Sequence, residues 1–572
     1  MDFLLDNFKH LTTTPKNVEQ LKKLVLQIAA QGNLTVKWRE DNLDLEPASV
    51  LLKKIITEKE QLIKDGRLPK EKPLPKITEA EKPFILPENW IWTRLGNIAY
   101  GFDYGTSSKS KIEGQIPVLR MGNIQDGQID WNKLVYTDDL IESEKYLLRK
   151  NDILFNRTNS RELVGKTALF DSHKKSIFAG YLVRFSVLNG INPIYTNYLM
   201  NSPFHRDWCN EVKSDAIGQS NINATKLRYY CFPLAPLAEQ KAIVSKVQSL
   251  FAQIDQLHEL AKKNKKLKED TAKALFGKVN SATDEQELQQ TWQLLKANFN
   301  TVTQGKEGVK QLRQTILQLA VQGKLTAKWR EENPDVEPAS VLLEKIKVEK
   351  EFLIKEGKLR REKSGKILKE DEIPFAIPKL WKWERLSLFC TKIGSGSTPN
   401  GSNYTLNGKP FFRSQNIYNH GLVYDDIKFI SEDIHKKMKG TIVYSNDILL
   451  NITGGSMGRC ALVPRNFDEG NVSQHVCIIR PILINNQFFH KLILSPFFQR
   501  LIFSSTSGNG REGLPKYNLE QFLIPIPPFT EQQVIVSKVN QLMALCDELE
   551  KKIEKRDSYQ ERIMQAVVKQ AI

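Results

Sequence analysis

A ten-residue stretch occurs twice in this chain and constrains the fold more than any other feature. Residues 31–40 read QGNLTVKWRE and residues 322–331 read QGKLTAKWRE. Extended to Leu52 and Leu343, the two copies agree at 17 of 22 positions, which chance does not produce. A second pair of matching segments lies further along the chain. EQKAIVSKV (239–247) and EQQVIVSKV (531–539) agree at seven of nine positions. Between these blocks the copies barely match, so the sequence predicts two similar frames that each hold a different insert.

Composition narrows the class of protein. A chain of 572 residues with 40% hydrophobic and 26% charged residues is typical of a soluble protein with several domains. The net charge of +17 favours a polyanionic partner, with nucleic acid first, although a solvated lysine-rich surface is the alternative. The acidic, interrupted N-terminus and the lack of any run near about 20 apolar residues argue against a signal peptide or membrane span. We therefore expect a cytoplasmic protein.

The cysteines and histidines suggest neither a disulfide framework nor a metal site. The six cysteines lie far apart without a CxxC spacing, and the eight histidines show no ligand spacing. The cysteines are Cys209, Cys231, Cys390, Cys460, Cys477 and Cys546. A reducing cytosol fits this pattern.

Apolar residues in the second repeated block recur in steps of four and three, as in a helix that keeps one face toward a partner helix. The positions are Ile243, Val247, Leu250, Ile254 and Leu257, and then Ile535, Val539, Leu542, Cys546, Leu549 and Ile553. Pro236 and Pro528 stand just upstream, where a helix can begin. We expect helices over about 237–278 and 529–570 that pair antiparallel as a coiled coil and act as spacers. A helix packed against its own domain is the alternative.

The leader of the opening motif occurs a third time. LQIAAQ (26–31) and ILQLAVQ (316–322) precede the two motifs, and IMQAVVKQ (563–570) lies among the last residues of the sequence. This order is expected if two repeats, each made of a leader, a motif, an insert and a long helix, form a closed ring that the chain ends interrupt just after one leader. It predicts that the N-terminal helix lies beside the C-terminal helix.

The inserts, about 96–233 and 387–525, read as mixed α/β domains. Short apolar runs rich in β-branched and aromatic residues alternate with Gly, Asn and Ser turns, as strands do. The runs are IPVLRM, DILFN and YLVRF in the first insert and PFFRS, DILLN and HVCIIR in the second. Both inserts also carry Ser-Pro-Phe in a helical stretch, at 202–204 and 495–497. The inserts therefore share a fold and differ in surface.

Several catalytic look-alikes fail on inspection. GKT at 165–167 would need glycine at 160 to complete a phosphate-binding loop, but Ser160 stands there. NPIY (192–195) and IPPF (526–529) each miss by one residue the Asn/Asp-Pro-Pro-aromatic signature with which amino-methyltransferases hold a flipped base. GSGST at 394–398 lacks the strand-to-helix context of a cofactor loop. The sequence therefore predicts no catalytic residue and no metal ligand.

The chain resembles the specificity (S, HsdS) subunit of type I restriction-modification enzymes. The likeness rests on the domain openings LPENWIWTRLGNI and IPKLWKWERLSLF, the internal NDILFN and NDILLN, and the exits PLAPLAEQKAIVSKV and PIPPFTEQQVIVSKV. The resemblance implies an internal pseudo-two-fold repeat in which two target recognition domains are separated by two long antiparallel helices. The expected boundaries are 1–85 for an N-terminal helical region, 86–235 and 377–527 for the recognition domains, 236–376 for a central conserved region, and 528–572 for the C-terminal helix.

The family resemblance also implies partners. Each recognition domain reads one half of a split sequence in double-stranded DNA, two methyltransferase (M) subunits dock on the conserved parts, and restriction (R) subunits complete the assembly. S-adenosylmethionine, ATP and Mg are then expected on the partners, and no cofactor is expected in this chain. The repeated motif would present one docking surface twice, through Lys37, Trp38 and Arg39 and through Lys328, Trp329 and Arg330. Packing of the motif within its own frame remains an alternative to docking.

Candidate DNA-contacting residues lie in polar, Gly-rich loops. Arg and Lys suit phosphate and guanine, and Asn and Gln suit adenine edges. The candidates are Thr106, Ser107, Lys109, Lys111, Arg157, Lys166, Gln219 and Asn221 in the first insert and Ser397, Thr398, Asn400, Arg459, Arg511 and Lys516 in the second. Arg120 and Arg413, present in both inserts, favour a shared structural role. Two other classes stay open: a regulator with two DNA-binding domains, and a coiled-coil scaffold.

Overall fold

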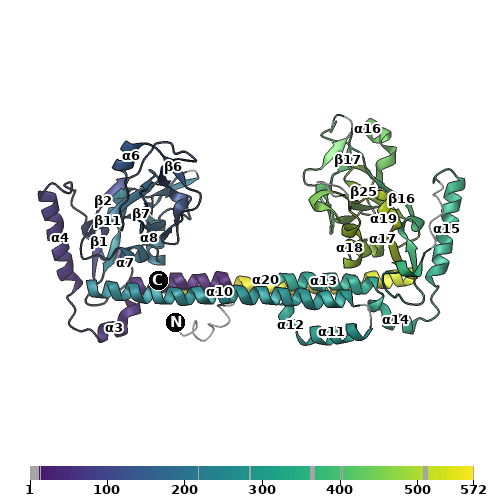
Figure 1. The fold of residues 1–572 in the computed structure, drawn as a ribbon, viewed down its shortest axis with the longest axis horizontal. Coiled ribbons are helices and arrows are strands. Elements are labelled where there is room, and N and C mark those ends of the chain that lie inside the picture. The colour runs from purple at the N-terminus through teal and green to yellow at the C-terminus, as the bar shows by residue number, and fades with distance from the viewer. Residues whose placement is uncertain are drawn as a thin grey trace. The chain divides into compact units, whose positions relative to one another are not determined.

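The repeat in the sequence is a repeat in the structure. The computed structural model describes residues 12, 14–216, 218–282, 285–360, 368–399, 401, 403–506 and 513–570 (Figure 1). The chain divides into two compact units, residues 1–265 with 557–572 and residues 266–556. Each unit holds one insert, one copy of the opening motif and parts of two long helices. The mixed α/β class predicted from the sequence is confirmed.

The frame of the first unit is helical. It comprises α2 (Pro15–Ala30), α3 (Val36–Glu40), α4 (Ala48–Lys64), the first part of α10 (Leu237–Ser281) and the last part of α20 (Phe529–Gln570). Thr14 begins α2, because its hydroxyl accepts a hydrogen bond of 3.2 Å from the backbone N–H of Asn17. The long helices predicted over 237–278 and 529–570 are confirmed by α10 and α20.

The first insert is a domain of small sheets with helices on its flank. Strand β1 pairs antiparallel with β14, so the opening of the domain meets its exit. The larger sheets have the orders β2-β11-β7-β9, β10-β3-β6 and β12-β13-β8. The strands are β1 Ile91–Arg94, β2 Ala99–Tyr104, β3 Ile116–Leu119, β4 Ile124–Gln125, β5 Gln128–Ile129, β6 Val135–Thr137, β7 Ile153–Asn156, β8 Thr158–Asn159, β9 Thr167–Leu169, β10 Ile177–Phe178, β11 Leu182–Val187, β12 Ser214–Ala216, β13 Gln219–Asn221 and β14 Cys231–Leu234. The helices are α5 Leu95–Ile98, α6 Leu140–Lys145, α7 Pro193–Leu199, α8 Pro203–Val212 and α9 Ala224–Arg228.

The second unit repeats this plan. Strand β15 pairs antiparallel with β26, and the two four-stranded sheets have the orders β16-β25-β22-β23 and β20-β17-β24-β21. The strands are β15 Lys382–Arg385, β16 Cys390–Ser395, β17 Lys409–Phe412, β18 Ile417–Tyr418, β19 Gly421–Leu422, β20 Lys428–Ile430, β21 Ile442–Tyr444, β22 Ile448–Asn451, β23 Cys460–Leu462, β24 Glu469–Val472, β25 Val476–Pro481 and β26 Leu523–Ile526. The helices are α11 Glu285–Ala297, α12 Phe299–Val302, α13 Lys306–Val321, α14 Ala327–Glu332, α15 Ala339–Lys355, α16 Glu432–Lys437, α17 Asn486–Ile493, α18 Pro496–Ser504 and α19 Lys516–Gln521, besides parts of α10 and α20.

The Ser-Pro-Phe stretch starts an equivalent helix in each domain. Pro203 and Pro496 occupy the first turn of α8 and α18, where a missing N–H costs nothing. The preceding Ser202 and Ser495 accept hydrogen bonds of 3.2 Å and 3.3 Å from the backbone N–H groups of His205 and Phe498. A cap and a proline at the same point fix where both helices begin.

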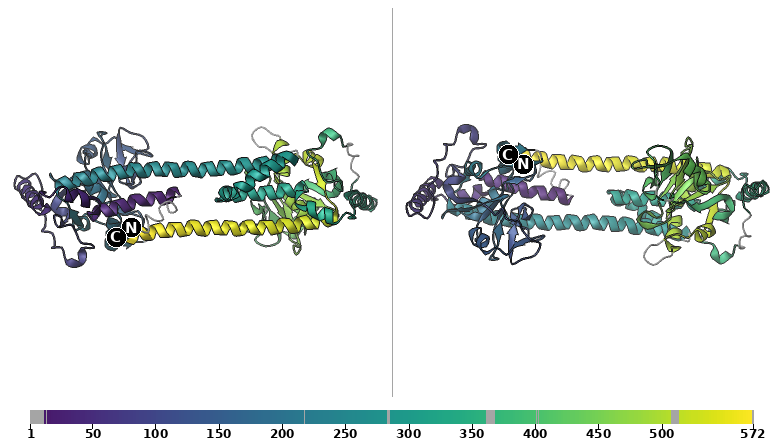
Figure 2. Two further views of the ribbon diagram at one scale, coloured as in Figure 1. Left: turned by 90° about the horizontal axis from the view of Figure 1, so that it is seen from below. Right: turned by 90° about the horizontal axis from the view of Figure 1, so that it is seen from above.

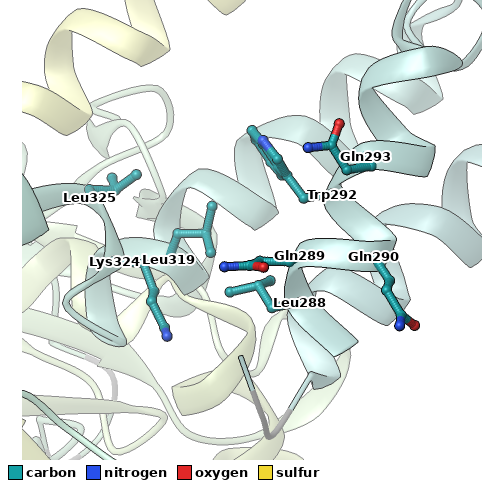
Figure 3. A pocket seen from close by; sticks show the side chains of 8 residues that line it. All are labelled: Leu288, Gln289, Gln290, Trp292, Gln293, Leu319, Lys324 and Leu325. Atoms are coloured by element: carbon teal, nitrogen blue, oxygen red, sulfur yellow. The ribbon is translucent and has the colours of Figure 1, made fainter. Parts of the chain in front are cut away.

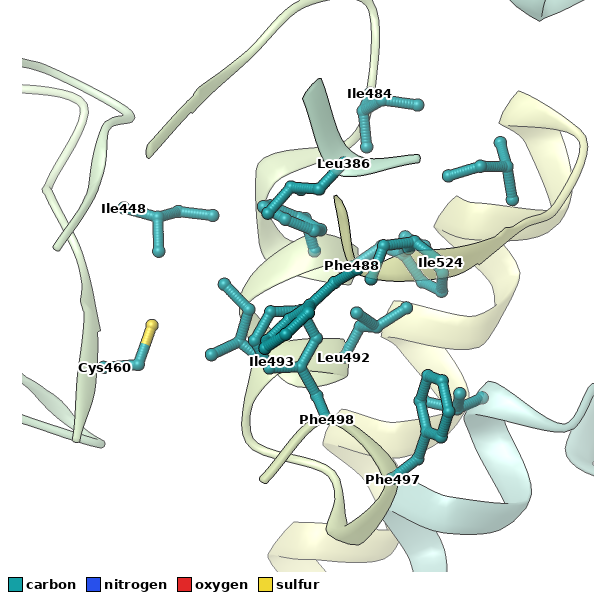
Figure 4. Packing of buried hydrophobic residues seen from close by; sticks show 14 of the residues in the cluster. Leu386, Ile448, Cys460, Ile484, Phe488, Leu492, Ile493, Phe497, Phe498 and Ile524 are labelled. Carbon is teal, nitrogen blue, oxygen red and sulfur yellow. The ribbon is translucent and has the colours of Figure 1, made fainter. Parts of the chain in front are cut away.

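Domain and frame share one hydrophobic core in each unit. In the second unit, buried residues of α13, β26 and α20 belong to the same cluster as the aromatic residues of α17 and α18. Figure 4 shows Phe488, Leu492 and Phe498 converging with Ile524. Burying each such side chain contributes about 1.5–3 kcal/mol, so the domain is anchored to its helices by the hydrophobic effect.

The leader helix of each unit lies against a long helix in antiparallel orientation. Figure 2 shows α2 running between α10 and α20 in the first unit. Lys22 of α2 pairs with Asp255 of α10 at 2.6 Å, and Lys16 pairs with Glu561 of α20 at 2.6 Å. Buried residues of all three helices form one cluster. The prediction that the N-terminal helix lies beside the C-terminal helix is confirmed for α2 and α20. In the second unit, Arg313 of α13 contacts Asp547 of α20 at 2.6 Å.

The apolar face of each long helix therefore meets two kinds of partner. Ile243 and Val247 of α10 belong to the core shared with the first domain, whereas Ile254 and Ala261 belong to the cluster with α2. The sequence predicted a helical partner for the whole face. The domain core supplies the partner over the first turns instead, which matches the alternative of a helix packed against its own domain there.

Candidate nucleic-acid interface

Four segments of the first domain meet at one edge through backbone hydrogen bonds. The Arg157 N–H donates to the Tyr181 carbonyl at 3.0 Å, and the Ile222 N–H donates to the Arg157 carbonyl at 2.9 Å. The Thr106 N–H donates to the Phe178 carbonyl at 2.9 Å, which brings the loop after β2 to the same place. We call this set, the segments around Thr106, Arg157, Tyr181 and Asn221, the first loop cluster.

The side chains of the first loop cluster are suited to nucleic acid. The Arg157 guanidinium stacks on Tyr104 at 4.4 Å from the ring centroid, and Asn221 donates to the Thr158 hydroxyl at 2.7 Å. Tyr104 and Tyr181 are 42% and 50% exposed, so both rings are accessible at the surface. A cation beside exposed aromatic rings offers both phosphate contact and a stacking surface.

Further cations flank the first loop cluster. Arg161 is exposed and lies 3.7 Å from Asp215, and Lys213 donates to the Arg161 carbonyl at 3.3 Å. Lys226 donates to the Val212 carbonyl at 2.6 Å. Arg161, Lys213 and Lys226 add three cations to this part of the surface, where they can attract phosphate.

The second domain builds an equivalent cluster from different residues. The Ile452 N–H donates to the His475 carbonyl at 3.0 Å, and the Leu514 N–H donates to the Ile452 carbonyl at 2.9 Å. Thr398 donates to the Gln474 side chain at 3.0 Å, and Thr453 bonds the His475 ring at 2.7 Å. We call the segments around Thr398, Thr453, His475 and Gly513 the second loop cluster. The backbone contacts match those of the first cluster, whereas the side chains do not.

Lys166 and Arg459 occupy matching positions outside the two clusters. Lys166 donates to the Gln125 side chain at 2.7 Å, and Arg459 stacks on Tyr418 at 4.9 Å. Gln125 and Tyr418 end the equivalent strands β4 and β18. The GKT triplet runs from the segment between β8 and β9 into β9, without the strand-to-helix turn of a phosphate-binding loop.

The other predicted contact residues are spread over the domains. Ser107, Lys109, Lys111, Gln219, Ser397 and Lys516 are exposed. Lys111 pairs with Asp138 at 2.9 Å and Lys516 with Glu520 at 3.1 Å. Thr106 is buried and its hydroxyl bonds Glu142, so it shapes its loop. Asn400 and Arg511 lie outside the described residues.

The structural role expected for Arg413 fits its contacts. Its guanidinium donates to the Asp426 carboxylate at 3.0 Å. Hydrogen bonds from Lys428 and Arg413 lower the pKa of Asp426 to about 2. This ion pair joins the end of β17 to the start of β20, so the Arg413 guanidinium makes its contact within its own domain.

The structure adds residues that sequence reasoning missed. Tyr104, Tyr181, Gln474 and His475 lie in the loop clusters, although none stands in a Gly-rich polar loop. The available signal was their equivalence, since GYLV at 180–183 aligns with QHVC at 474–477. The second residue of each stretch, Tyr181 or His475, carries an exposed ring and stands directly before a buried strand, β11 or β25.

The docking candidates of the repeated motif point in two directions. Lys37 and Lys328 are exposed, and Trp38 and Trp329 are partly exposed. The guanidinium groups of Arg39 and Arg330 turn inward and pair with Glu239 and Glu531. The packing alternative thus describes the two arginines, while the lysines and tryptophans remain at the surface.

The residues that line a groove beside α11 include no pair of side chains suited to catalysis. It has a volume of about 530 Å³ and is lined by Leu288, Trp292 and Leu325 together with glutamines and one lysine (Figure 3). Amides, aliphatic groups and a single cation provide no nucleophile paired with a base.

No helix among the described residues is long and apolar enough to cross a membrane.

The duplicated frame with two diverged domains defines the class of protein, and comparison with known families agrees. The family model for the type I restriction modification DNA specificity domain matches residues 87–269 and 378–556. The chain therefore belongs to the specificity-subunit family of type I restriction-modification systems.

Individual relatives extend the likeness to nearly the whole chain. The EcoAI specificity subunit of Escherichia coli is 29% identical over 544 residues, covering 93% of this chain and 90% of the relative. The EcoEI specificity subunit of Escherichia coli is 26% identical, covering 97% and 94%. The crystal structure of the HsdS subunit from Thermoanaerobacter tengcongensis is 16% identical with a TM-score of 0.37, covering 86% of this chain and 98% of that one.

Proposed function

We propose that this chain is the non-catalytic subunit that reads a bipartite sequence in double-stranded DNA. The observation that carries the proposal is the pair of loop clusters, which share a backbone and differ in side chains. Two readers built on one scaffold suit two different half-sites. The net charge of +17 supplies the attraction to phosphate on which any duplex binding depends.

The proposal assigns different work to different residues. Arg157 and Asn221, with Thr398 and Arg459, contact bases or phosphates through their polar side chains. The two loop clusters contribute Tyr181 and His475 as further contacts. The exposed predicted residues Ser107, Lys109, Gln219 and Ser397 add polar side chains to these surfaces.

The proposed partners are two methyltransferase subunits, joined by restriction subunits. The two copies of the opening motif present Lys37 with Trp38 and Lys328 with Trp329 to identical partners. S-adenosylmethionine, ATP and Mg belong to those partners, and the assembly works in the cytoplasm, where the duplex is found. The relatives support this reading because their names are those of specificity subunits.

A selection experiment tests the proposal. The full chain, purified with its methyltransferase subunits, is offered a pool of duplexes with a random central region, and the retained duplexes are sequenced. We expect two conserved blocks separated by a gap of fixed length. A single continuous block would favour a conventional regulator, and no enrichment would favour a scaffold; either result would contradict the proposal.

Methyl transfer provides a second test. The chain alone with S-adenosylmethionine should leave duplex DNA unmodified, and transfer should begin when the methyltransferase subunits are added. Cleavage should further require the ATP-dependent partner. Modification by the rigorously purified chain alone would refute the assignment of a non-catalytic role.

A further inference from the structure

A buried carboxylate stands at the start of each long helix. Glu239 lies in the first turn of α10 with none of its side chain exposed. Three donors reach it: the Thr35 hydroxyl at 2.6 Å, the Trp90 indole N–H at 2.8 Å and the Arg39 guanidinium at 2.5 Å. The first turn of a helix is also where a negative charge is stabilised by the unpaired N–H groups.

The second unit repeats this site. Glu531 lies in the first turn of α20, equally buried, and accepts from Thr326 at 2.7 Å, Trp381 at 2.8 Å and Arg330 at 2.5 Å. We call the two sites, Glu239 with its donors and Glu531 with its donors, the carboxylate latches. Each latch closes within one unit.

Each latch joins three segments that are far apart in the sequence. Arg39 belongs to the opening motif, Trp90 stands at the opening of the recognition domain, and Glu239 lies in the first turn of the long helix. The next residue extends the connection, because Gln240 accepts from the Asn192 N–H at 2.8 Å and donates to the Ala235 carbonyl at 2.9 Å. The latch therefore ties the helix to both ends of the domain and to the frame.

A neighbouring glycine makes room for the latch. Gly32 has φ of +74°, and a Cβ placed there would lie 2.7 Å from Pro87 and 3.2 Å from the Trp90 ring. Its carbonyl also accepts from Arg39 at 2.7 Å. Gly323 repeats this with Pro378 and Trp381. The glycine, threonine and arginine of the repeated motif thus belong to the latch.

The latch restricts orientation in a way that the hydrophobic core does not. Burial of apolar surface is non-directional, so a core alone lets a domain settle at several angles on its helix. A buried carboxylate is tolerated only while its donors stay in hydrogen-bonding geometry. Thr35 and Arg39 hold the carboxylate to the frame and Trp90 holds it to the domain. With the Asn192–Gln240 hydrogen bond, these contacts tie the orientation of the domain to the helix and the frame.

We propose that Glu239 and Glu531 are positioning residues that set the gap between the two half-sites. Each fixes the direction in which its recognition domain leaves the long helix, and hence where its loop cluster meets the duplex. This inference rests on the proposed reading of bipartite DNA. It assigns gap selectivity to the latches in addition to the length of the helices.

The test is the selection from random duplexes, performed with the full chain and its methyltransferase subunits. Glu239→Gln and Glu531→Gln keep the shape of the side chain and remove its charge. For each variant, we expect unchanged half-site sequences and a rise of about tenfold in the share of retained duplexes with neighbouring gap lengths. The matched control is Asp152→Asn, a buried carboxylate whose partners Ser186 and Arg149 belong to the same domain. That variant should leave the gap distribution unchanged.

A second variant covers the case in which Glu239→Gln does not fold. Removing the carboxylate leaves the Arg39 guanidinium, whose side chain is 17% exposed, without its counter-charge. The double variant Glu239→Gln with Arg39→Gln removes both charges and should fold while showing the same broadened gap. A gap distribution as narrow as that of the unmodified chain in the folded variants would overturn the inference. Failure of the unmodified chain to select two blocks would instead overturn the proposed function.

Discussion

Lengthening both long helices in their exposed middle stretches should lengthen the gap between half-sites. In α10, residues 262–268 are all exposed, between the buried Ala261 and Ala272. In α20, residues 554–559 are exposed, between the buried Ile553 and Met564. Four residues inserted after Lys265 and four after Ser558 would therefore leave the packed ends of both helices unchanged. Insertion after Leu257, by contrast, would disturb the contact with α2.

The expected size follows from helix geometry. Four residues extend a helix by about 6 Å and turn it by about 40° beyond a full turn. At about 3.4 Å of rise per base pair, the preferred gap should grow by roughly two base pairs. Insertions of seven residues at the same points, which return closer to the original phase, should lengthen it by about three base pairs.

The assay is methylation or binding across duplexes that differ only in gap length. Both half-sites should stay the same in every insertion variant, because the loop clusters are untouched. Insertion into α10 alone is the control, and it should lower stability because α20 keeps its original length. An altered half-site with an unchanged gap would show that the helices do not set the spacing.

Four further results are expected. Arg157→Ala and Arg459→Ala should each weaken binding to the selected duplex by about 1–3 kcal/mol, measured by titration, and equal affinity would exclude either residue from the interface. Binding should fall as salt rises, with a slope of about −0.9 for each phosphate contact, and a flat salt series would contradict the electrostatic reading. Ile535→Ala, at a site 1% exposed, should cost about 2–5 kcal/mol of unfolding free energy in urea. Burial lowers the pKa of His205 from 6.5 to about 3, so the unfolded chain binds the proton first and stability should fall as the pH drops from 6.5 toward 3. His205→Asn should reduce this loss, whose slope is at most about 1.4 kcal/mol per pH unit.

The frame could be predicted because its signals are local and repeated. The period of four and three located α20 at Phe529–Gln570, and the apolar runs located β7 and β22. The partner of the long helix was harder to predict. An apolar stripe shows that a face is buried, but the same stripe fits a second helix, a leader helix or a domain core.

The sites were predicted only in part, because they depend on contacts between distant segments. Arg157 and Asn221 were predicted as contact residues from residue type, and that remains a prediction. Tyr181 joins their segments through a backbone hydrogen bond that no sequence spacing indicates. Glu239 and Trp90 stand 149 positions apart, so nothing local indicates that one accepts a hydrogen bond from the other. The repetition of Arg39 suggested a shared partner, and an internal carboxylate satisfies its guanidinium.

The backbone construction of the loop clusters has a consequence for how this family can change over generations. The bonds that hold Arg157 to Tyr181 and Ile452 to His475 run between main-chain groups, which every residue except proline can supply. Under the proposed function, a mutation of one of these side chains would alter which bases are read while the main-chain bonds of the scaffold stay in place. New sequence preferences would then arise by single substitutions that selection against unfolding does not remove, and each cluster would change independently of the other.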